Sequence, residues 1–228
     1  MVKNVILSPH FDDAVFSCWY LINHLPSEVI TIFGGVPPSR TSTLWDRLCG
    51  ESDSTKMMMK RKLENKSALD GTGTSYRNLS YLDKQYRSSK LDILEITNNI
   101  LLLASSESQF FAPLALGKLW KHPDHVIVRN VGKLLLSQGR KVSFYADVPY
   151  MQMPKVVTEK YKERMEKFHI FFNTKLLIQV HELSKDQQNM KLEAMMKYRS
   201  QYKMSNLISL GTLKREANLK REVLFIPN

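Results

Sequence analysis

The sequence predicts an α/β protein built on a mostly parallel, twisted sheet with helices on both faces. Short apolar runs rich in β-branched residues recur along the 228-residue chain and alternate with segments of helical pattern. The first runs are almost continuously apolar, as in "VILS" at residues 5–8, which is typical of strands buried on both faces. The chain length suits one generous domain, so we assign residues 1–228 to a single domain.

The elements follow one another in order along the chain. Strands are expected at residues 5–8, 29–33, 77–82, 109–114, 141–145 and 176–180. Helices are expected at residues 15–24, 56–69, 91–103, 125–137, 156–168 and 186–202. The second helix stops at Asp70-Gly71, and glycine is a common helix terminator. We expect a long polar loop at residues 34–55, and one or two extra strands within residues 205–228.

The composition limits the classes of partner and the compartment. The net charge of +11 favours anionic partners, but the lysines are interleaved with glutamates, which is typical of a solubilising surface. The sequence contains no nucleic-acid-binding signature, so we expect no nucleic acid partner. The chain has two cysteines, no apolar run long enough to span a bilayer, and no secretory signal. We therefore expect a cytoplasmic protein.

The first group of reactive side chains comes directly after the first expected strand, in "SPHFDDAVFSC" at residues 8–18. His10, Asp12 and Asp13 would lie at the carboxyl end of a strand, the edge at which open α/β sheets bind ligands. An imidazole and a carboxylate are typical ligands of zinc, and a neighbouring carboxylate can act as a base toward a bound water. The alternative is a turn at Pro9 and an aspartate cap on the next helix.

The second group lies in "KHPDHVIVRN" at residues 121–130. Proline is favoured in the first turn of a helix, so His122 or a neighbour would cap a helix that Pro123 begins. His122 and His125 would then share one face, and Asp124 could orient a histidine. An ordinary capped helix is the alternative. Because both groups follow strands of one sheet, a metal site at its carboxyl edge explains them together.

These residues resemble the PIG-L/LmbE-like zinc-dependent N-deacetylases. "SPHFDDAVFSC" is similar to the family signature Pro-His-Pro-Asp-Asp-Glu, in which alanine often replaces the glutamate, and "HPDH" is similar to the second motif. "TIFGGVP", "RKLENKSAL", "FYADVPY" and "YRSQ" match further family segments in the same order. The resemblance covers most of the chain and implies a Rossmann-like fold.

The resemblance also implies a cofactor and a reaction. The cofactor would be one Zn²⁺ per chain, with another divalent metal as an alternative, held by His10, Asp13 and His125. A zinc-bound water would attack the amide of an N-acetylated amino sugar of the N-acetylglucosamine type. The roles of the other residues in the two motifs would be general base (Asp12), oxyanion stabiliser and acid (His122) and partner of a histidine (Asp124).

The residues expected to contact substrate are less well defined. Arg61 would contact the aglycone or a phosphate by resemblance, and Tyr145 and Asp147 follow a strand and could line the pocket. The chain departs from the family at Phe11, where proline is usual, and at Trp19-Tyr20, where many members have small glycines. This bulk repacks the first helix or reshapes the pocket.

The substrate class and the assembly remain open. The amino sugar could be a small molecule or be linked to a lipid or a nucleotide, and a homo-oligomer is compatible with the sequence. The alternatives to a deacetylase are a metal-dependent hydrolase of another amide or ester and a non-catalytic relative that binds an anionic glycan.

Overall fold

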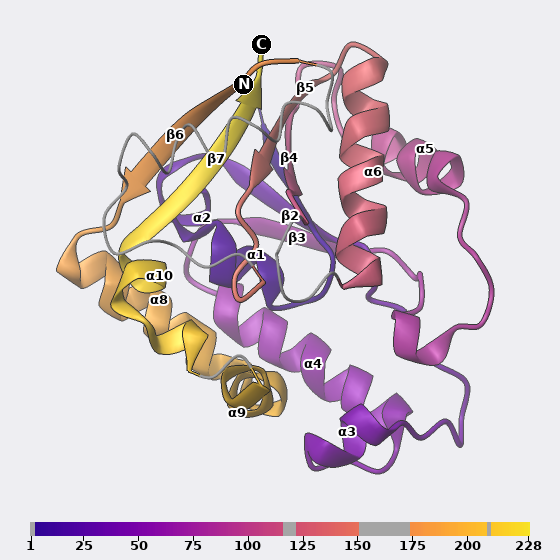
Figure 1. Cartoon of the computed structure of the whole chain (residues 1–228). Coiled ribbons are helices and arrows are strands. Elements are labelled where there is room, and N and C mark those ends of the chain that lie inside the picture. Colours follow the sequence, from indigo (N-terminus) through magenta and orange to yellow (C-terminus); the bar gives the residue numbers. More distant parts are fainter. Residues whose placement is uncertain (1–2, 116–121, 151–173, 209–210) are drawn as a thin grey trace.

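A seven-stranded sheet forms the centre of the computed structural model, which describes all residues except 1–2, 116–121, 151–173 and 209–210 (Figure 1). The strands are β1 (Asn4–Ser8), β2 (Ser27–Thr31), β3 (Ser75–Asn78), β4 (Gln109–Pro113), β5 (Lys141–Tyr145), β6 (Leu176–Glu182) and β7 (Arg221–Pro227). Their order across the sheet is β3-β2-β1-β4-β5-β7-β6. Strands β1 to β5 are parallel, whereas β7 is antiparallel to both neighbours, β5 and β6. The predicted α/β class is confirmed.

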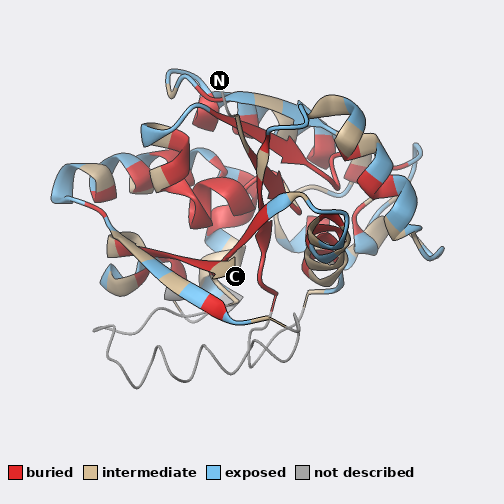
Figure 2. Cartoon of the chain, turned by 90° about the horizontal axis from the view of Figure 1, so that it is seen from above, coloured by how far each residue is buried: buried red, intermediate tan, exposed pale blue. Residues whose placement is uncertain are grey.

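Helices cover both faces of the sheet, and each face has its own apolar core. Val5 and Leu7 of β1 pack into one core with α5 (Ile93–Leu103) and α6 (Pro123–Ser137), whereas Ile6 points into the other. The second core is completed by α1 (Asp13–Ser17), α2 (Trp19–His24), α4 (Ser54–Leu69) and α8 (Lys185–Lys197). Figure 2 shows the buried strands between helices whose outer surfaces are exposed. This alternation explains why the first strands are continuously apolar.

The first expected helix, at residues 15–24, is two helices in the structure. The backbone leaves the helical conformation at Cys18, with φ −132° and ψ 31°, and α2 begins at Trp19. The carboxylate of Glu222 accepts hydrogen bonds from the backbone N–H groups of Trp19 and Tyr20, both at 2.8 Å. The N–H groups at a helix start need such acceptors. Glu222 lies far away in the sequence, so the local pattern gave no sign of the break.

The last expected helix, at residues 186–202, is also divided. Helix α8 ends at Lys197, and α9 (Arg199–Ile208) follows after Tyr198. The carboxylate of Glu64 accepts hydrogen bonds from the backbone N–H of Ser200, at 2.9 Å, and from its hydroxyl, at 2.5 Å. Both breaks in helical segments are therefore stabilised by a glutamate from a distant element.

Several other expectations are met only in part. The one or two strands expected within residues 205–228 are represented by β7; among the described residues of this segment, the end of α9, a 3₁₀ turn η3 (Thr212–Lys214) and α10 (Glu216–Lys220) come before it. The loop at 34–55 contains α3 (Leu44–Leu48), which Thr43 caps, and α4 begins at Ser54. Strand β3 is shorter than expected and is followed by η1 (Lys84–Tyr86). The expected helix at 156–168 lies outside the described residues.

Helix α6 packs closely on β4 and β5, with its N-terminus at the carboxyl edge of the sheet (Figure 1). A Cβ atom added at Gly132 would lie 2.7 Å from the Cβ of Ala112 and 2.9 Å from Cε1 of Phe144. The missing side chain thus allows the helix to approach the sheet. This contact fixes where the first turn of α6 lies relative to the end of β1.

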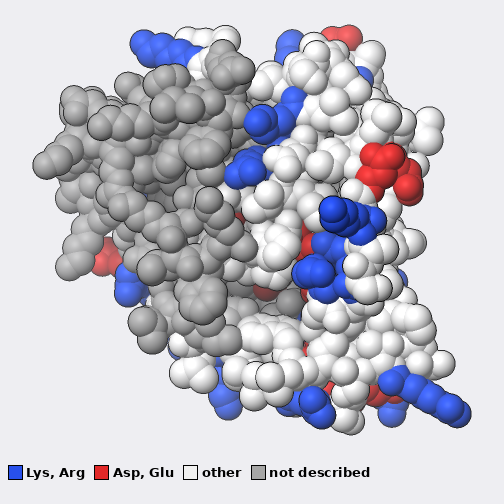
Figure 3. Space-filling view, turned by 45° about the vertical axis from the view of Figure 1, so that its right-hand side comes forward, with Lys and Arg blue, Asp and Glu red and all other residues white. Residues whose placement is uncertain are grey.

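The surface carries charge of both signs. On the face in Figure 3, basic side chains are distributed among uncharged and acidic ones rather than gathered in one continuous patch. This distribution agrees with the interleaved lysines and glutamates of the sequence. Within the described part of the chain, no helix combines the length and the apolar character needed to cross a membrane.

Candidate metal centre

The turn after β1 carries the first half of the candidate site. Ser8 ends the strand, and its hydroxyl donates to the carbonyl of His10 at 2.5 Å and accepts the backbone N–H of Ala14 at 3.0 Å. Asp12 occupies the N-cap position of α1, but its side chain makes no capping hydrogen bond. Its carboxylate is nevertheless buried, with 7% of the residue exposed. The structural alternative, an aspartate cap at this position, therefore does not account for Asp12.

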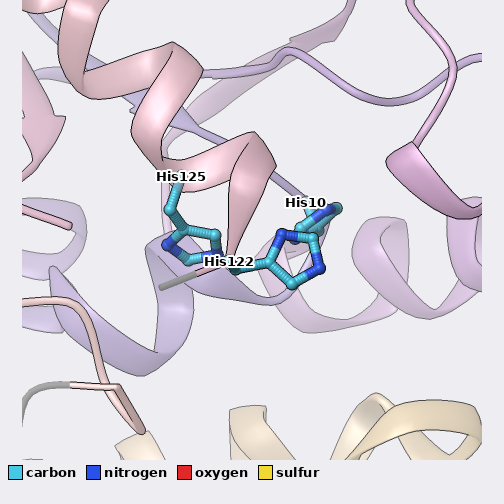
Figure 4. A group of neighbouring side chains, drawn as sticks. All are labelled: His10, His122 and His125. Atoms are coloured by element: carbon cyan, nitrogen blue, oxygen red, sulfur yellow. The ribbon is translucent and has the colours of Figure 1, made fainter. Parts of the chain in front are cut away.

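The first turn of α6 carries the second half. His122 is the N-cap, as expected, and its Nδ1 accepts the backbone N–H of Asp124 at 3.3 Å. His122 and His125 point from this turn toward His10 at the end of β1 (Figure 4). The ring centroid of His10 lies 4.8 Å from that of His122 and 5.5 Å from that of His125. One nitrogen of each histidine lies within 4.8 Å of the others.

Asp13 lies between two of these histidines. Its Oδ2 lies 3.1 Å from Nδ1 of His10 and 3.2 Å from Nε2 of His125. The buried Nε2 of His125 makes no hydrogen bond within the described part of the chain, despite this short distance. A buried polar atom is normally satisfied, and a metal ion would satisfy this one. Two imidazole nitrogens and a carboxylate oxygen form a donor set that suits zinc, so the predicted ligands fit the ion.

Asp147 belongs to this site, where it contacts a histidine. Its Oδ2 lies 3.0 Å from Nδ1 of His125, and its Oδ1 accepts the backbone N–H of Ala115 at 3.0 Å. The residue is 1% exposed, so the predicted contact with substrate is corrected to a contact with a histidine. A carboxylate on one nitrogen of an imidazole fixes the tautomer and leaves the other nitrogen free for a metal.

We expect the Asp147→Asn variant to bind zinc about 10–100-fold more weakly than the wild type. Asparagine can still accept the N–H of Ala115 through its oxygen, but its amide then turns a donor toward Nδ1 of His125. Competition with a chromophoric zinc chelator measures the affinity. Asp186→Asn, in the first turn of α8, is the control and should bind zinc as tightly as the wild type. Equal affinity in Asp147→Asn and wild type would contradict this role.

Asp124 orients His10 rather than His125. Its Oδ2 lies 3.1 Å from Nε2 of His10 and accepts the backbone N–H of Lys84 at 2.9 Å, and its Oδ1 pairs with the guanidinium of Arg87. Arg87 also lies over the ring of Phe33, 4.8 Å from its centroid. The sequence predicted a histidine partner here without saying which histidine. It gave no sign of Arg87, which comes from the segment after η1 and reaches the site only through the fold.

Two further predicted contacts with substrate have other partners. Arg61 is 2% exposed, and its Nη2 donates to Oδ1 of Asp46 at 2.9 Å, while Tyr86 donates to Oδ2 of Asp46 at 2.7 Å. Contact between Arg61 and substrate stays a prediction. Tyr145 is fully buried, and its hydroxyl donates to the carbonyl of Leu7 at 2.9 Å. It supports β1 from behind the site, so we withdraw it as a substrate contact.

Two further side chains, those of Asp83 and Tyr150, lie beside the histidines of the site. Asp83 lies 3.8 Å from Nε2 of His10 and is mostly buried. Its position before a 3₁₀ turn in a polar segment resembles an ordinary cap, so no local signal marked it. The ring of Tyr150 packs edge-on against His125 with the centroids 4.6 Å apart.

Burial and neighbouring charges shift the pKa values of the titratable side chains in the site in different directions. Burial, reinforced by the charge of Asp13, raises the pKa of Asp12 to about 7, although His10 and Arg61 act in the opposite direction. Burial lowers the pKa of His122 to about 4, together with the charges of His10 and His125. For His125, burial is outweighed by Asp13 and Asp147, and the pKa rises to about 9. The site thus combines a carboxyl group that titrates near neutral pH with a neutral imidazole.

Comparison with known proteins finds several deacetylases that are similar to this chain. No model of a protein family matches the chain. A 2'-N-acetylparomamine deacetylase from Niallia circulans is 28% identical over 187 residues, which cover 65% of this chain and 67% of the relative. The structure of an A40926 pseudoaglycone deacetylase superposes with a TM-score of 0.74 at 21% identity, covering 99% of this chain and 96% of the other. A zinc-inhibited form of a teicoplanin deacetylase gives 0.73 at 17% identity, covering 100% and 99%.

Proposed function

We propose that this chain, which has the fold and the relatives of the PIG-L/LmbE-like deacetylases, removes the acetyl group from an N-acetylated amino sugar. The observation that carries the proposal is the donor set around Asp13, with Nδ1 of His10 at 3.1 Å and Nε2 of His125 at 3.2 Å. Asp12, buried next to this set and not used as a helix cap, supports the same conclusion. The three relatives named above are deacetylases and indicate the reaction class.

Zinc is the metal we propose for the site, with His10, Asp13 and His125 as its ligands. A bound zinc ion would polarise the acetyl carbonyl and lower the pKa of a coordinated water to about 7. The carboxylates on the outer nitrogens support this ligand set, because Asp124 faces Nε2 of His10 and Asp147 faces Nδ1 of His125. Each imidazole can then offer the metal the lone pair of its remaining nitrogen.

The proton transfers are assigned to side chains of this chain. Asp12 accepts the proton of the attacking water, and its raised pKa of about 7 suits a group that gains and loses a proton at neutral pH. His122 donates a hydrogen bond to the carbonyl oxygen as that oxygen becomes negative. The amine leaves only after protonation, and Asp12 returns the proton to it. The products are acetate and a free amino sugar.

The substrate we propose is a glycoside of N-acetylglucosamine within a larger small molecule. The names of two relatives give their substrates as 2'-N-acetylparomamine and the A40926 pseudoaglycone. The large side chains of Trp19 and Tyr20 fill the start of α2, which belongs to the second core rather than to the turn that carries His10.

Acetate release tests the proposal. The purified chain with one equivalent of zinc is incubated with 2'-N-acetylparomamine, an N-acetylglucosaminyl glycopeptide and a simple N-acetylglucosaminide, and acetate is measured enzymatically. We expect release from at least one of them, loss of release after treatment with a chelator, and recovery on addition of zinc. Zinc binding without acetate release would favour hydrolysis of another amide or ester. Release unaffected by the chelator would contradict the metal-dependent reaction.

A further inference from the structure

The turn that follows β4 has a backbone conformation that alanine rarely adopts. Ala115 has φ +50°, in the left-handed region, which is unfavourable for residues other than glycine. The residue is buried and comes shortly after β4 ends at Pro113. Backbone strain of this kind persists only where surrounding contacts hold it, and it is most frequent at functional sites. The contacts that hold Ala115 in this conformation are therefore informative.

Both polar groups of the Ala115 backbone make hydrogen bonds to side chains. The N–H donates to Oδ1 of Asp147 at 3.0 Å, and the carbonyl accepts a hydrogen bond from Nη1 of Arg129 at 3.3 Å. The other oxygen of Asp147 lies 3.0 Å from Nδ1 of His125. Among the residues that the structure describes, no further group bonds to this carboxylate. The place of Asp147 beside His125 therefore depends on the direction of the Ala115 N–H.

Arg129 and His125 lie four residues apart in α6, and residues with this spacing share one face of a helix. The contacts therefore form a closed ring that runs from His125 through Asp147, Ala115 and Arg129 back to the same helix. Burial lowers the pKa of Arg129, whereas the charge of Asp147 raises it, so the guanidinium lies near this carboxylate. The other hydrogen bonds of Arg129 go to Oδ1 of its neighbour Asn130, both at 3.4 Å.

We propose that Arg129 is a positioning residue of the metal centre: it holds the left-handed turn at Ala115, whose N–H keeps Asp147 against His125. The inference rests on the proposed function, because it takes His125 as a ligand of zinc. Without the guanidinium, Ala115 relaxes toward an ordinary backbone conformation and its N–H turns away from Asp147. The carboxylate then orients the imidazole less firmly, and zinc binds more weakly. The effect of Arg129 on the metal thus passes through Ala115 and Asp147.

The zinc affinity of the full chain with Arg129→Met tests this inference. Methionine keeps much of the apolar stem of arginine but cannot donate to the carbonyl of Ala115. We expect this variant to bind zinc about 2–10-fold more weakly than the wild type, the effect of one hydrogen bond. Adding Ala115→Gly should restore most of the lost affinity, because glycine adopts a positive φ without strain and does not need the guanidinium. Competition with a chromophoric chelator measures the affinities of the wild type, both single variants and the double variant, and acetate release is measured on the same samples.

Arg140→Met is the matched control, because Arg140 also donates to a backbone carbonyl, that of Ser105, but directly precedes β5 at the opposite edge of the sheet. It should bind zinc as tightly as the wild type. Unchanged affinity in Arg129→Met, or an equal loss with and without Ala115→Gly, would overturn the inference. A wild-type chain that binds no zinc would overturn it together with the proposed function. If the affinities follow the expected pattern but no acetate is released, the proposed reaction fails and the role of Arg129 stands.

Discussion

Replacing Asp12 with asparagine is expected to lower kcat for acetate release by about 10²–10⁴-fold, the usual contribution of a general acid–base group. Asparagine has nearly the same shape as aspartate but cannot accept the proton of the attacking water. Because the side chain of Asp12 does not cap α1, the substitution leaves the helix start intact. Zinc content should stay at the wild-type level. The rate is measured with one equivalent of zinc, and the bound metal by elemental analysis.

Asp53→Asn is the matched control for this variant. Asp53 is an aspartate that does cap its helix, by accepting the backbone N–H groups of Thr55 and Lys56. Asparagine is an equally good cap, so both activity and zinc content should match the wild type. If Asp12→Asn lost its zinc as well as its activity, Asp12 would be a ligand rather than a base. If it kept full activity, another group would have to accept the proton.

Replacing His125 with alanine is expected to abolish stable zinc binding and, with it, acetate release. The variant loses one of the three proposed ligands, and the Asp13 and Asp147 carboxylates lose the imidazole between them. Removing one partner of a buried charged group typically costs about 3–5 kcal/mol, so the free energy of unfolding should also fall. Zinc retained after dialysis and the midpoint of urea unfolding measure the two effects.

His24→Ala is the control for His125→Ala, because His24 is an exposed histidine on α2 that is not part of the histidine cluster. It should retain zinc and stability. A His125→Ala chain that remains folded and holds one zinc with wild-type affinity would exclude His125 as a ligand. The metal would then have to be held by the other group, formed by His10, Asp83, His122 and Asp124.

The sequence was most informative where structure depends on local pattern. Strands β1, β4 and β5 and helices α5 and α6 lie within a few residues of their expected positions, because an apolar run or a helical period identifies them directly. The breaks at Cys18 and Tyr198 could not be predicted, since each is stabilised by a glutamate from a distant element. The position of β7 inside the sheet, antiparallel to both neighbours, is likewise decided by packing and not by its own sequence.

In the candidate site, too, local sequence predicted some features and distant contacts decided the others. The residues of the two motifs lie together as expected, because both motifs follow strands that end at one edge of the sheet. Of the groups around the ligands, Asp124 was predicted as the partner of a histidine, whereas Arg87 and Asp83 come from segments without a motif and were not predictable. Tyr145 shows the opposite error: its position after a strand near the site was read as access to substrate, whereas the side chain is fully buried.

The hydrogen bonds from Trp19 and Tyr20 to Glu222 have a consequence for how the chain folds. They join residues 203 and 202 positions apart, and Glu222 also pairs with the buried Lys191 at 2.7 Å. Helix α1, which holds Asp13, is followed immediately by the helix that Glu222 completes. During synthesis, the ribosome must therefore release β7 before the region around the first motif can reach its final form. Contacts of such long sequence separation slow folding. The carboxyl edge of the sheet, which carries the candidate site, should therefore be among the last parts of the molecule to become ordered.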